Sequence, residues 1–155
     1  MEQSSRTLPV DLHDWRLGVW RRFLTAHARI NRELERELED GIGMPLAWYD
    51  VLLQLAEAPG RRLRMADLAD AVLLSRSGLS RLVDRLERAG LVRRERSPVD
   101  LRGTFTVLTA EGVHRLRAAV PIHLAGIRTH FLERLDDDRL RELDAVLACL
   151  TRSRE

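Results

Sequence analysis

The most constraining feature of the sequence is a change of apolar period near residue 90. Between residues 76 and 89, apolar side chains recur three or four positions apart, as on one face of a helix: Leu79, Leu82, Val83 and Leu86. Gly90 is the kind of residue that ends a helix. Beyond it, residues 91–97 and 104–108 have the character of strands, and the loop 98–103 contains proline and glycine. We therefore predict a β-hairpin directly after helix 76–89.

Two helices and a shorter one are expected before this unit. Apolar residues three or four apart extend from about residue 11 to residue 40, and Gly41-Ile-Gly43 would end this long helix. A second helix is predicted over 45–58 and a short third helix over 65–72. Ser75 suits the N-cap of helix 76–89. Helices 65–72 and 76–89 are therefore predicted to form a helix-turn-helix.

The remainder of the chain is again helical. Thr109 can cap a helix that extends to about Leu135, and we expect Pro121 to bend or break it. A last helix should begin at residues 136–138, with leucines directed inward at positions 140, 143, 147 and 150. The predicted fold class is mainly α with a small β-hairpin wing, which makes α+β: a winged helix-turn-helix over 45–109, flanked by helices over 11–40 and 110–150.

Charge is distributed unevenly along the chain. All 26 basic residues are arginine, and the net charge is only +2. Residues 61–102 nevertheless contain 11 arginines against 6 acidic residues, whereas the rest of the chain has 15 against 18. A local positive excess of this kind is typical of a surface that binds phosphate, although a solvated charged surface would have the same composition.

Several functional classes find no support in the residues. There is no glycine-rich phosphate loop, no nucleophile motif and no metal-ligand spacing among the five histidines, so we predict neither an enzyme nor a metal or cofactor site. The sequence contains no run of about 18 apolar residues, so we expect no membrane span and a cytoplasmic protein. The single cysteine, Cys149, lies among apolar residues of the last helix, and we expect it to be buried and structural.

If the apolar stripe of helix 76–89 faces the core, its opposite face is polar and basic. That face carries Arg76, Ser77, Ser80, Arg81, Asp84, Arg85 and Arg88. The major groove of DNA accepts one helix, arginine can bind guanine through two hydrogen bonds, and serine can bond a base edge or a phosphate. The alternative is an exposed polar face with no ligand.

The hairpin favours the first interpretation. Arg94 belongs to a basic strand, and Arg102 lies at the tip of the hairpin beside Gly103. An arginine on such a wing can enter the minor groove, where the negative potential is concentrated. Asp100 could hold Arg85 or Arg102 in place through a two-point ion pair, or could simply form the turn.

Two motifs resemble the MarR family of bacterial winged helix-turn-helix regulators. Residues 78–94, Gly-Leu-Ser-Arg-Leu-Val-Asp-Arg-Leu-Glu-Arg-Ala-Gly-Leu-Val-Arg-Arg, are similar to that family's recognition helix. Asp100-Leu-Arg-Gly103, followed by Leu108-Thr-Ala-Glu-Gly112, is similar to its wing signature. The order of elements over residues 11–150 resembles the family as well.

The resemblance implies a homodimer joined through the first and last helices, so that 11–40 and 110–150 form its dimerisation region. It implies binding to a pseudopalindromic operator in double-stranded DNA, and a repressor that is released by a small, often aromatic or phenolic, effector. Carried over by position, Ser77, Ser80 and Arg81 would contact the major groove and Arg102 the minor groove. The alternative function is a winged helix used for protein interaction or RNA binding, without a ligand response.

A site for such an effector is predicted between the first and second helices. Trp20 and His27 lie on one stripe of the first helix, Trp48 opens the second, and Arg16 could pair with a carboxylate. The alternative is that these side chains serve core and dimer packing.

Overall fold

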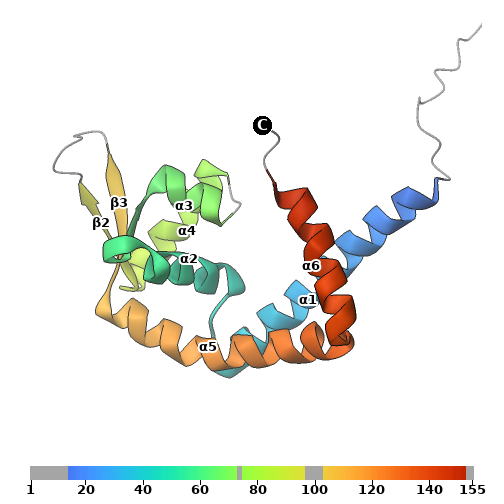
Figure 1. The fold of residues 1–155 in the computed structure, drawn as a ribbon. Helices are drawn as coiled ribbons and strands as arrows, with labels where there is room; N and C mark the ends of the chain where they lie inside the picture. The colour runs from blue at the N-terminus through green and yellow to red at the C-terminus, as the bar shows by residue number, and fades with distance from the viewer. Residues whose placement is uncertain (1–13, 73–74, 97–102, 153–155) are drawn as a thin grey trace, which may run out of the picture.

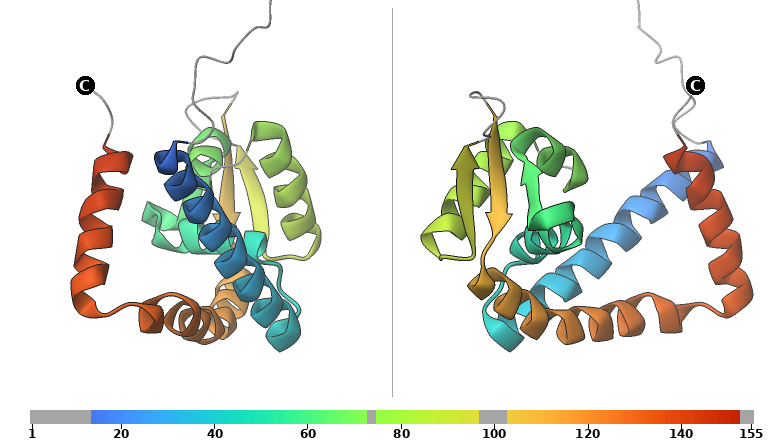
Figure 2. Two further views of the ribbon diagram at one scale, coloured as in Figure 1. Left: turned by 90° about the vertical axis from the view of Figure 1, so that its right-hand side faces the viewer. Right: turned by 60° about the vertical axis from the view of Figure 1, so that its left-hand side comes forward.

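The computed structural model describes residues 14–72, 75–96 and 103–152. A winged unit lies at one end of the molecule and a helical frame, made by α1, α5 and α6, extends away from it (Figure 1). Figure 2 shows α5 along the base of the molecule, with the sheet above one end of it and α6 rising from the other. The predicted fold class, mainly α with a small β wing, is confirmed.

Helix α1, Trp15–Ile42, starts at the N-cap Asp14, whose side chain accepts a hydrogen bond from the Arg16 N–H. It ends within the predicted segment Gly41–Gly43, at Gly43, which has the left-handed φ of +61° that is common at a helix C-cap. Gly41 has another role, because a Cβ there would lie 2.8 Å from Cδ1 of Ile122 on α5. The absent side chain is what lets the two long helices cross closely.

Helix α2, Leu46–Glu57, begins one residue later than predicted, and the Leu46 N–H donates to Oε2 of Glu35 on α1 at 2.7 Å. A 3-10 turn, η1 (Pro59–Arg61), leads to strand β1, Arg62–Arg64, and then to α3, Met65–Ala71. The sequence did not predict β1, because a strand of three residues is too short to establish an alternation. It pairs antiparallel with β3, with Leu63 opposite Thr106.

Helix α4, Arg76–Arg88, follows the expected N-cap Ser75, whose Oγ accepts a hydrogen bond from the Gly78 N–H at 3.2 Å. The hairpin is present as predicted: β2, Val92–Arg96, pairs antiparallel with β3, Thr104–Leu108. In the described ranges the strand order is β1-β3-β2, so β3 is the central strand.

Helix α5, Ala110–His130, has the predicted N-cap Thr109, whose Oγ1 accepts from the Gly112 N–H. It continues through Pro121 without the expected break and ends five residues earlier than predicted. A second 3-10 turn, η2 (Leu132–Arg134), leads to α6, Asp137–Thr151, which is capped by Asp136.

One apolar core holds the winged unit together. It takes side chains from every helix of that unit, from β2 and β3, and from the adjoining ends of α1 and α5: Leu38, Met44, Tyr49, Val51, Leu52, Leu55, Leu68, Ala69, Leu79, Leu82, Val83, Leu86, Leu91, Val92, Leu108, Leu116 and Ala119. Helix α6 contributes none of its described residues to this core.

Candidate nucleic-acid interface

Helix α4 is fixed to the core by the apolar stripe that the sequence predicted. Leu79, Leu82, Val83 and Leu86 are all buried. The opposite face is therefore turned to solvent, where Ser77, Arg81 and Arg85 are exposed and Ser80 is half-buried. The structure thus brings these four predicted residues together on one side of α4.

A shallow groove of about 600 Å³ runs beside this face, between α4 and the start of α2. Its walls are formed by Ala47, Gly78, Arg81, Leu82, Asp84, Arg85 and Arg88. Three of these side chains are arginines spaced four and three residues apart, so they form one basic edge of the helix. Such an edge can follow the negatively charged backbone of a nucleic acid.

Arg94 connects the wing to α4. Its guanidinium lies 2.5 Å from Oδ1 of Asp84 and 2.6 Å from Oε2 of Glu87, and its backbone N–H donates to Oε1 of Glu87 at 2.9 Å. Partial burial lowers the pKa of Arg94, but the hydrogen bonds to the two carboxylates outweigh it and raise the pKa above its ordinary value. The charge is permanent, and strand β2 is held at a set orientation relative to α4.

This arrangement bears on the predicted role of Arg94 as a DNA contact. The side chain is 29% exposed and is engaged with two carboxylates, so its first role in the structure is to position β2. Direct contact with DNA stays a prediction for this residue. Asp84 and Glu87 were missed as wing partners, although their spacing on one side of α4 was a usable signal.

Two predicted wing residues, Asp100 and Arg102, lie outside the described residues, as does the side chain of Arg76. Their roles stay predictions. The described parts of β2 and β3 that flank this segment are paired in register from Val92 opposite Leu108 to Arg96 opposite Thr104. The hairpin is therefore formed up to the residues that border the predicted tip.

Of the four residues proposed from sequence as an effector site, three lie on the outer part of α1 and Trp48 lies apart from them. Arg16 forms an ion pair with Asp14, and Trp20 stacks on Phe23 with ring centroids 5.9 Å apart. Trp48 instead packs against the core of the winged unit. Trp20 lies 22 residues from the end of α1, which is about 33 Å at 1.5 Å per residue, so within one chain it is far from the start of α2. The aromatic stack continues from Phe23 to His27.

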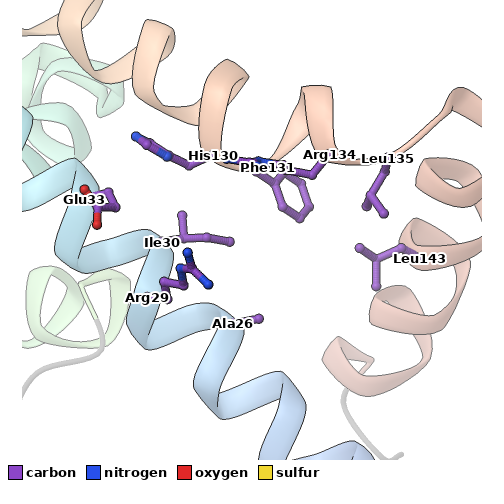
Figure 3. Close-up of a pocket in the computed structure, with 9 residues that line it drawn as sticks. All are labelled: Ala26, Arg29, Ile30, Glu33, His130, Phe131, Arg134, Leu135 and Leu143. Atoms are coloured by element: carbon purple, nitrogen blue, oxygen red, sulfur yellow. The ribbon is translucent and has the colours of Figure 1, made fainter.

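A cavity of about 510 Å³ does occur in the helical frame, between α1, the end of α5 and α6 (Figure 3). Ala26, Arg29, Ile30, Glu33, His130, Phe131, Arg134, Leu135 and Leu143 line it, and none of the four predicted effector residues is among them. Figure 3 shows Ile30 on α1 and Phe131, just past the end of α5, facing the space from opposite sides. Its mixture of an apolar interior and a few charged groups is typical of a small-molecule site.

Side-chain contacts also join the frame to the winged unit. The ring of His123 on α5 lies against that of Tyr49 on α2, with centroids 4.1 Å apart. Burial lowers the pKa of His123, and its Nδ1 is buried without a hydrogen-bond partner within the described ranges. Within the frame itself, Nε2 of His130, the last residue of α5, lies 2.7 Å from Oε1 of Glu37 on α1.

Cys149 is exposed, contrary to the prediction that it would be buried. The reason is that its helix, α6, has no partner element over that surface in the single chain, and Val146 and Leu150 beside it are exposed as well.

Two further observations concern the described ranges alone. No cluster of three His, Cys, Asp or Glu side chains there is arranged to hold a metal ion, and no helix there has the length and apolar character of a membrane span.

Comparison with known proteins identifies the chain. The model of the MarR family matches residues 42–103, the segment from the end of α1 to the wing. Sco3205 of Streptomyces coelicolor, a MarR family transcriptional regulator crystallised in complex with DNA, is 38% identical to this chain. Their structures superpose with a TM-score of 0.85 over 92% of this chain and 89% of Sco3205. The chain belongs to the MarR family.

Two further relatives agree with this placement. AbsC, also from Streptomyces coelicolor, is 38% identical, with a TM-score of 0.84 over 91% of this chain and 95% of AbsC. The transcriptional regulator HosA of Escherichia coli O111:H- is 38% identical over 90 residues, which are 58% of this chain and 64% of HosA. The chain thus matches less than two thirds of the length of HosA, and these relatives are named as regulators of transcription.

Proposed function

We propose that this protein binds double-stranded DNA and regulates transcription from a pseudopalindromic operator. The observation that carries the proposal is the rigid pairing of α4 with the hairpin, since Arg94 ties β2 to two carboxylates of the helix that presents Ser77, Arg81 and Arg85. A helix and a wing held in this way can enter adjacent major and minor grooves. Sco3205, crystallised with DNA, is 38% identical and has the same fold.

The proposal gives individual residues the roles that the family resemblance implies. Ser77, Ser80 and Arg81 on the outward face of α4 contact base edges and phosphates of the major groove, as the family resemblance implies. Arg85 continues the basic edge of the helix toward the phosphate backbone. Arg102 enters the minor groove.

The protein acts as a homodimer in this proposal, joined through the helices of residues 11–40 and 110–150. Support comes from the apolar side chains that the frame leaves exposed in the single chain, including Trp20 at 56% on α1 and Leu150 at 72% on α6. Phe23, Leu24 and Val146 are exposed on the same two helices. Monomeric proteins rarely expose so many large apolar side chains together, because burying them in a partner lowers the free energy.

Selection from a pool of random duplexes tests the DNA-binding function directly. We expect enrichment of an inverted repeat whose half-sites lie about one helical turn apart, and an affinity that falls steeply with salt concentration. Arg81→Ala should relax the base preference at one position of each half-site, by about 1–3 kcal/mol if it bonds a base edge. Arg117→Ala, which removes an exposed arginine on α5, is the matched control and should leave the preference unchanged.

Two outcomes would contradict the proposal. One is that no duplex is enriched, and the other is that single-stranded RNA of the same composition competes as well as the selected duplex. The second outcome would favour the alternative function, a winged helix used to bind RNA. Sedimentation at micromolar concentration measures the dimer in the same samples.

We further propose that the protein is a repressor released by a small aromatic anion that binds in the cavity of the helical frame. The cavity volume of about 510 Å³ suits a small ligand, Phe131 offers a ring for stacking, and Arg29 and Arg134 can pair with a carboxylate. Because α1 and α6 are also the proposed dimer helices, a bound ligand would change how the two winged units are spaced.

Tryptophan emission reports on this site, since Trp20 lies on α1 within two turns of the lining residue Ala26. Titration with salicylate should change the emission and release the selected duplex, and Arg134→Ala should weaken both effects together. A broad panel of aromatic acids that changes neither the emission nor the DNA affinity would contradict effector control. DNA binding itself would remain established by the selection.

A further inference from the structure

The charges of α1 are divided between its two halves. Residues 15–32 contain five arginines and no acidic residue, whereas residues 33–40 contain five acidic residues and one arginine. That arginine, Arg36, is paired within the acidic half, with Glu33 and with Asp40. We call residues 15–32 the basic half of α1.

The arginines of the basic half border an exposed apolar stripe. Arg22 and Arg29 are seven residues apart, which is about two turns, so they lie along one edge of the stripe. Arg21 and Arg32 are eleven residues apart, about three turns, and lie along the other edge. All four are exposed, and none of them is ion-paired within the described ranges. The stripe between them includes the exposed side chains Val19, Trp20, Phe23 and Leu24.

Helix α6 has the same layout with the opposite charge. Its leucines form an apolar stripe, and Glu142 and Asp144 follow the two edges of that stripe on either side of Leu143. Both carboxylates are exposed, and in the part of the chain that the structure describes neither has an ion-pair partner. The two arginines within the helix are each paired with an aspartate at its start.

These two sets of charges do not meet within one chain. The cavity of about 510 Å³ lies between α1 and α6 (Figure 3), and no ion pair joins the two helices among the residues that the structure describes. An apolar stripe with charges of one sign along its edges is complementary to a helix whose stripe is bordered by the opposite sign, as in coiled coils. Helix α6 of a second copy is such a helix.

Two-fold symmetry leaves three ways to pair these helices in a homodimer. Contact of α1 with α1 of the second copy would bring arginines together, and contact of α6 with α6 would bring carboxylates together, so both are repulsive. Contact of α1 with α6 of the second copy places arginines against carboxylates. In a symmetric interface this contact occurs twice. Electrostatics therefore favours the crossed arrangement.

We propose that the basic half of α1 binds α6 of a second copy, with its arginines against Glu142 and Asp144 and the two apolar stripes buried between them. Charge thereby selects both the partner and its orientation. The inference rests on the homodimer of the proposed function and adds which helices meet in it.

Charge reversal on each helix tests the pairing. The α1 variant, Arg21→Glu with Arg22→Glu, and the α6 variant, Glu142→Arg with Asp144→Arg, each turn attraction into repulsion at both symmetric contacts. Sedimentation without DNA should give either variant a dimer dissociation constant at least about tenfold above that of the wild type. The wild-type constant should itself rise with salt concentration, because salt screens exposed charges.

The combined variant, which has all four reversals, again places opposite charges against each other and should recover most of the lost dimer affinity. The control, Arg85→Glu with Arg88→Glu, reverses the same number of charges at exposed positions of α4 and should dimerise as the wild type does. Urea unfolding of the winged unit shows that each variant is folded, since that unit has its own core.

Three outcomes would contradict the inference. If the α1 and α6 variants dimerise as tightly as the wild type, these charges do not face each other, and the homodimer stands. If both variants lose affinity and the combined variant does not recover it, the loss does not come from this pairing. If the wild type is monomeric at micromolar concentration, the homodimer and the inference fail together, whereas DNA binding is judged separately by the selection of duplexes.

Discussion

The winged unit and the helical frame bury their apolar residues in different ways. From α2 to the start of α5 nearly every helix and strand contributes to one core, in which side chains such as Leu52 and Leu79 are fully buried. In the described part of the frame, α6 buries no residue and α1 buries none before Leu34. The two regions are nonetheless parts of one chain and share α1 and α5.

We infer from this difference in burial that the two regions obtain their stability from different sources. The winged unit can hold its fold through its own core, because its leucines already have neighbours on all sides. The outer parts of α1 and α6 are amphipathic helices with exposed apolar residues, and helices of this kind owe most of their stability to tertiary packing. We expect that packing to come from the second copy, so the frame should respond to protein concentration and the winged unit should not.

The largest expected effect comes from truncating a side chain in each region. Leu52→Ala in α2 should lower the free energy of unfolding by about 2–5 kcal/mol, because it leaves a cavity in a packed core. Leu150→Ala in α6 should change the unfolding of the winged unit by less than about 0.5 kcal/mol. It should instead weaken the dimer. Urea unfolding at several protein concentrations, with sedimentation, measures both quantities.

The proposed difference in the source of stability would be contradicted if Leu150→Ala destabilised the winged unit as strongly as Leu52→Ala. It would also be contradicted if dilution of the wild-type protein changed neither its sedimentation nor its unfolding curve. Either result would mean that the exposed face of α6 is not a dimer surface.

Substitution of two glycines is a second test, in which the expected changes in stability are somewhat smaller. A Cβ at Gly112 would collide with the carbonyl oxygen of Leu91 and lie 2.7 Å from Cδ1 of Leu108, so Gly112→Ala should destabilise the protein by about 1–3 kcal/mol. Gly18→Ala, in the exposed part of α1, meets only the flexible end of Arg22 at 3.7 Å and should stabilise α1 by up to about 1 kcal/mol. Thermal unfolding of both variants shows whether the signs are opposite, and equal signs would contradict the contrast between the regions.

The link between wing and helix should have a smaller effect on stability than on DNA binding. Arg94→Ala removes the bridge from β2 to Asp84 and Glu87, and we expect a loss of about 1 kcal/mol in unfolding free energy, since the pair is partly exposed. A double-mutant cycle with Glu87→Gln isolates the interaction. Affinity for the selected duplex should fall further than stability, because the wing would lose its orientation. A cycle with no coupling would show that Arg94 does not position the wing.

The smallest expected effect on stability concerns the contact of His123 on α5 with Tyr49 on α2, where the frame meets the winged unit. Burial lowers the pKa of His123 below its ordinary value of 6.5, so between the two values the unfolded chain binds more protons than the folded one. Stability should therefore fall as the pH drops through 6.5, and stop falling once the folded histidine is protonated. His123→Phe keeps a ring against Tyr49 and should remove this dependence, whereas His114→Gln, at an exposed position, should retain it. Urea midpoints between about pH 8 and pH 5 would reveal the difference.

Much of the fold followed from local patterns. The apolar stripe of α4, the caps Ser75 and Thr109, and the change to alternating residues after Gly90 are set by a few neighbouring residues, and each was confirmed. The sequence also indicated that Ser77, Arg81 and Arg85 share the outward face of α4, because a helix with one buried stripe leaves only one other face.

Contacts between distant residues could not be predicted in this way. Strand β1 exists because its backbone pairs with β3, some forty residues later, and three residues have no pattern of their own. The segment Gly41–Gly43 was expected to end α1, and Gly43 does so, but the close approach of Ile122 to Gly41 was not predicted. The helix predicted across Pro121 is present without a break there. Trp20 and Trp48 share an apolar character, yet the length of α1 keeps them apart.

Local patterns in the sequence were enough to predict the helices and the hairpin of β2 and β3, the polar face of α4 and the resemblance to the MarR family, since each depends on residues close together in the chain. The tertiary structure decided which charged and apolar side chains meet across the fold. It directed Arg94 to two carboxylates of α4, stacked Arg62 and Arg64 on Phe105, and left the apolar faces of α1 and α6 exposed. The physical reason is that ion pairing, stacking and burial depend on distances across the fold, which local periodicity does not encode.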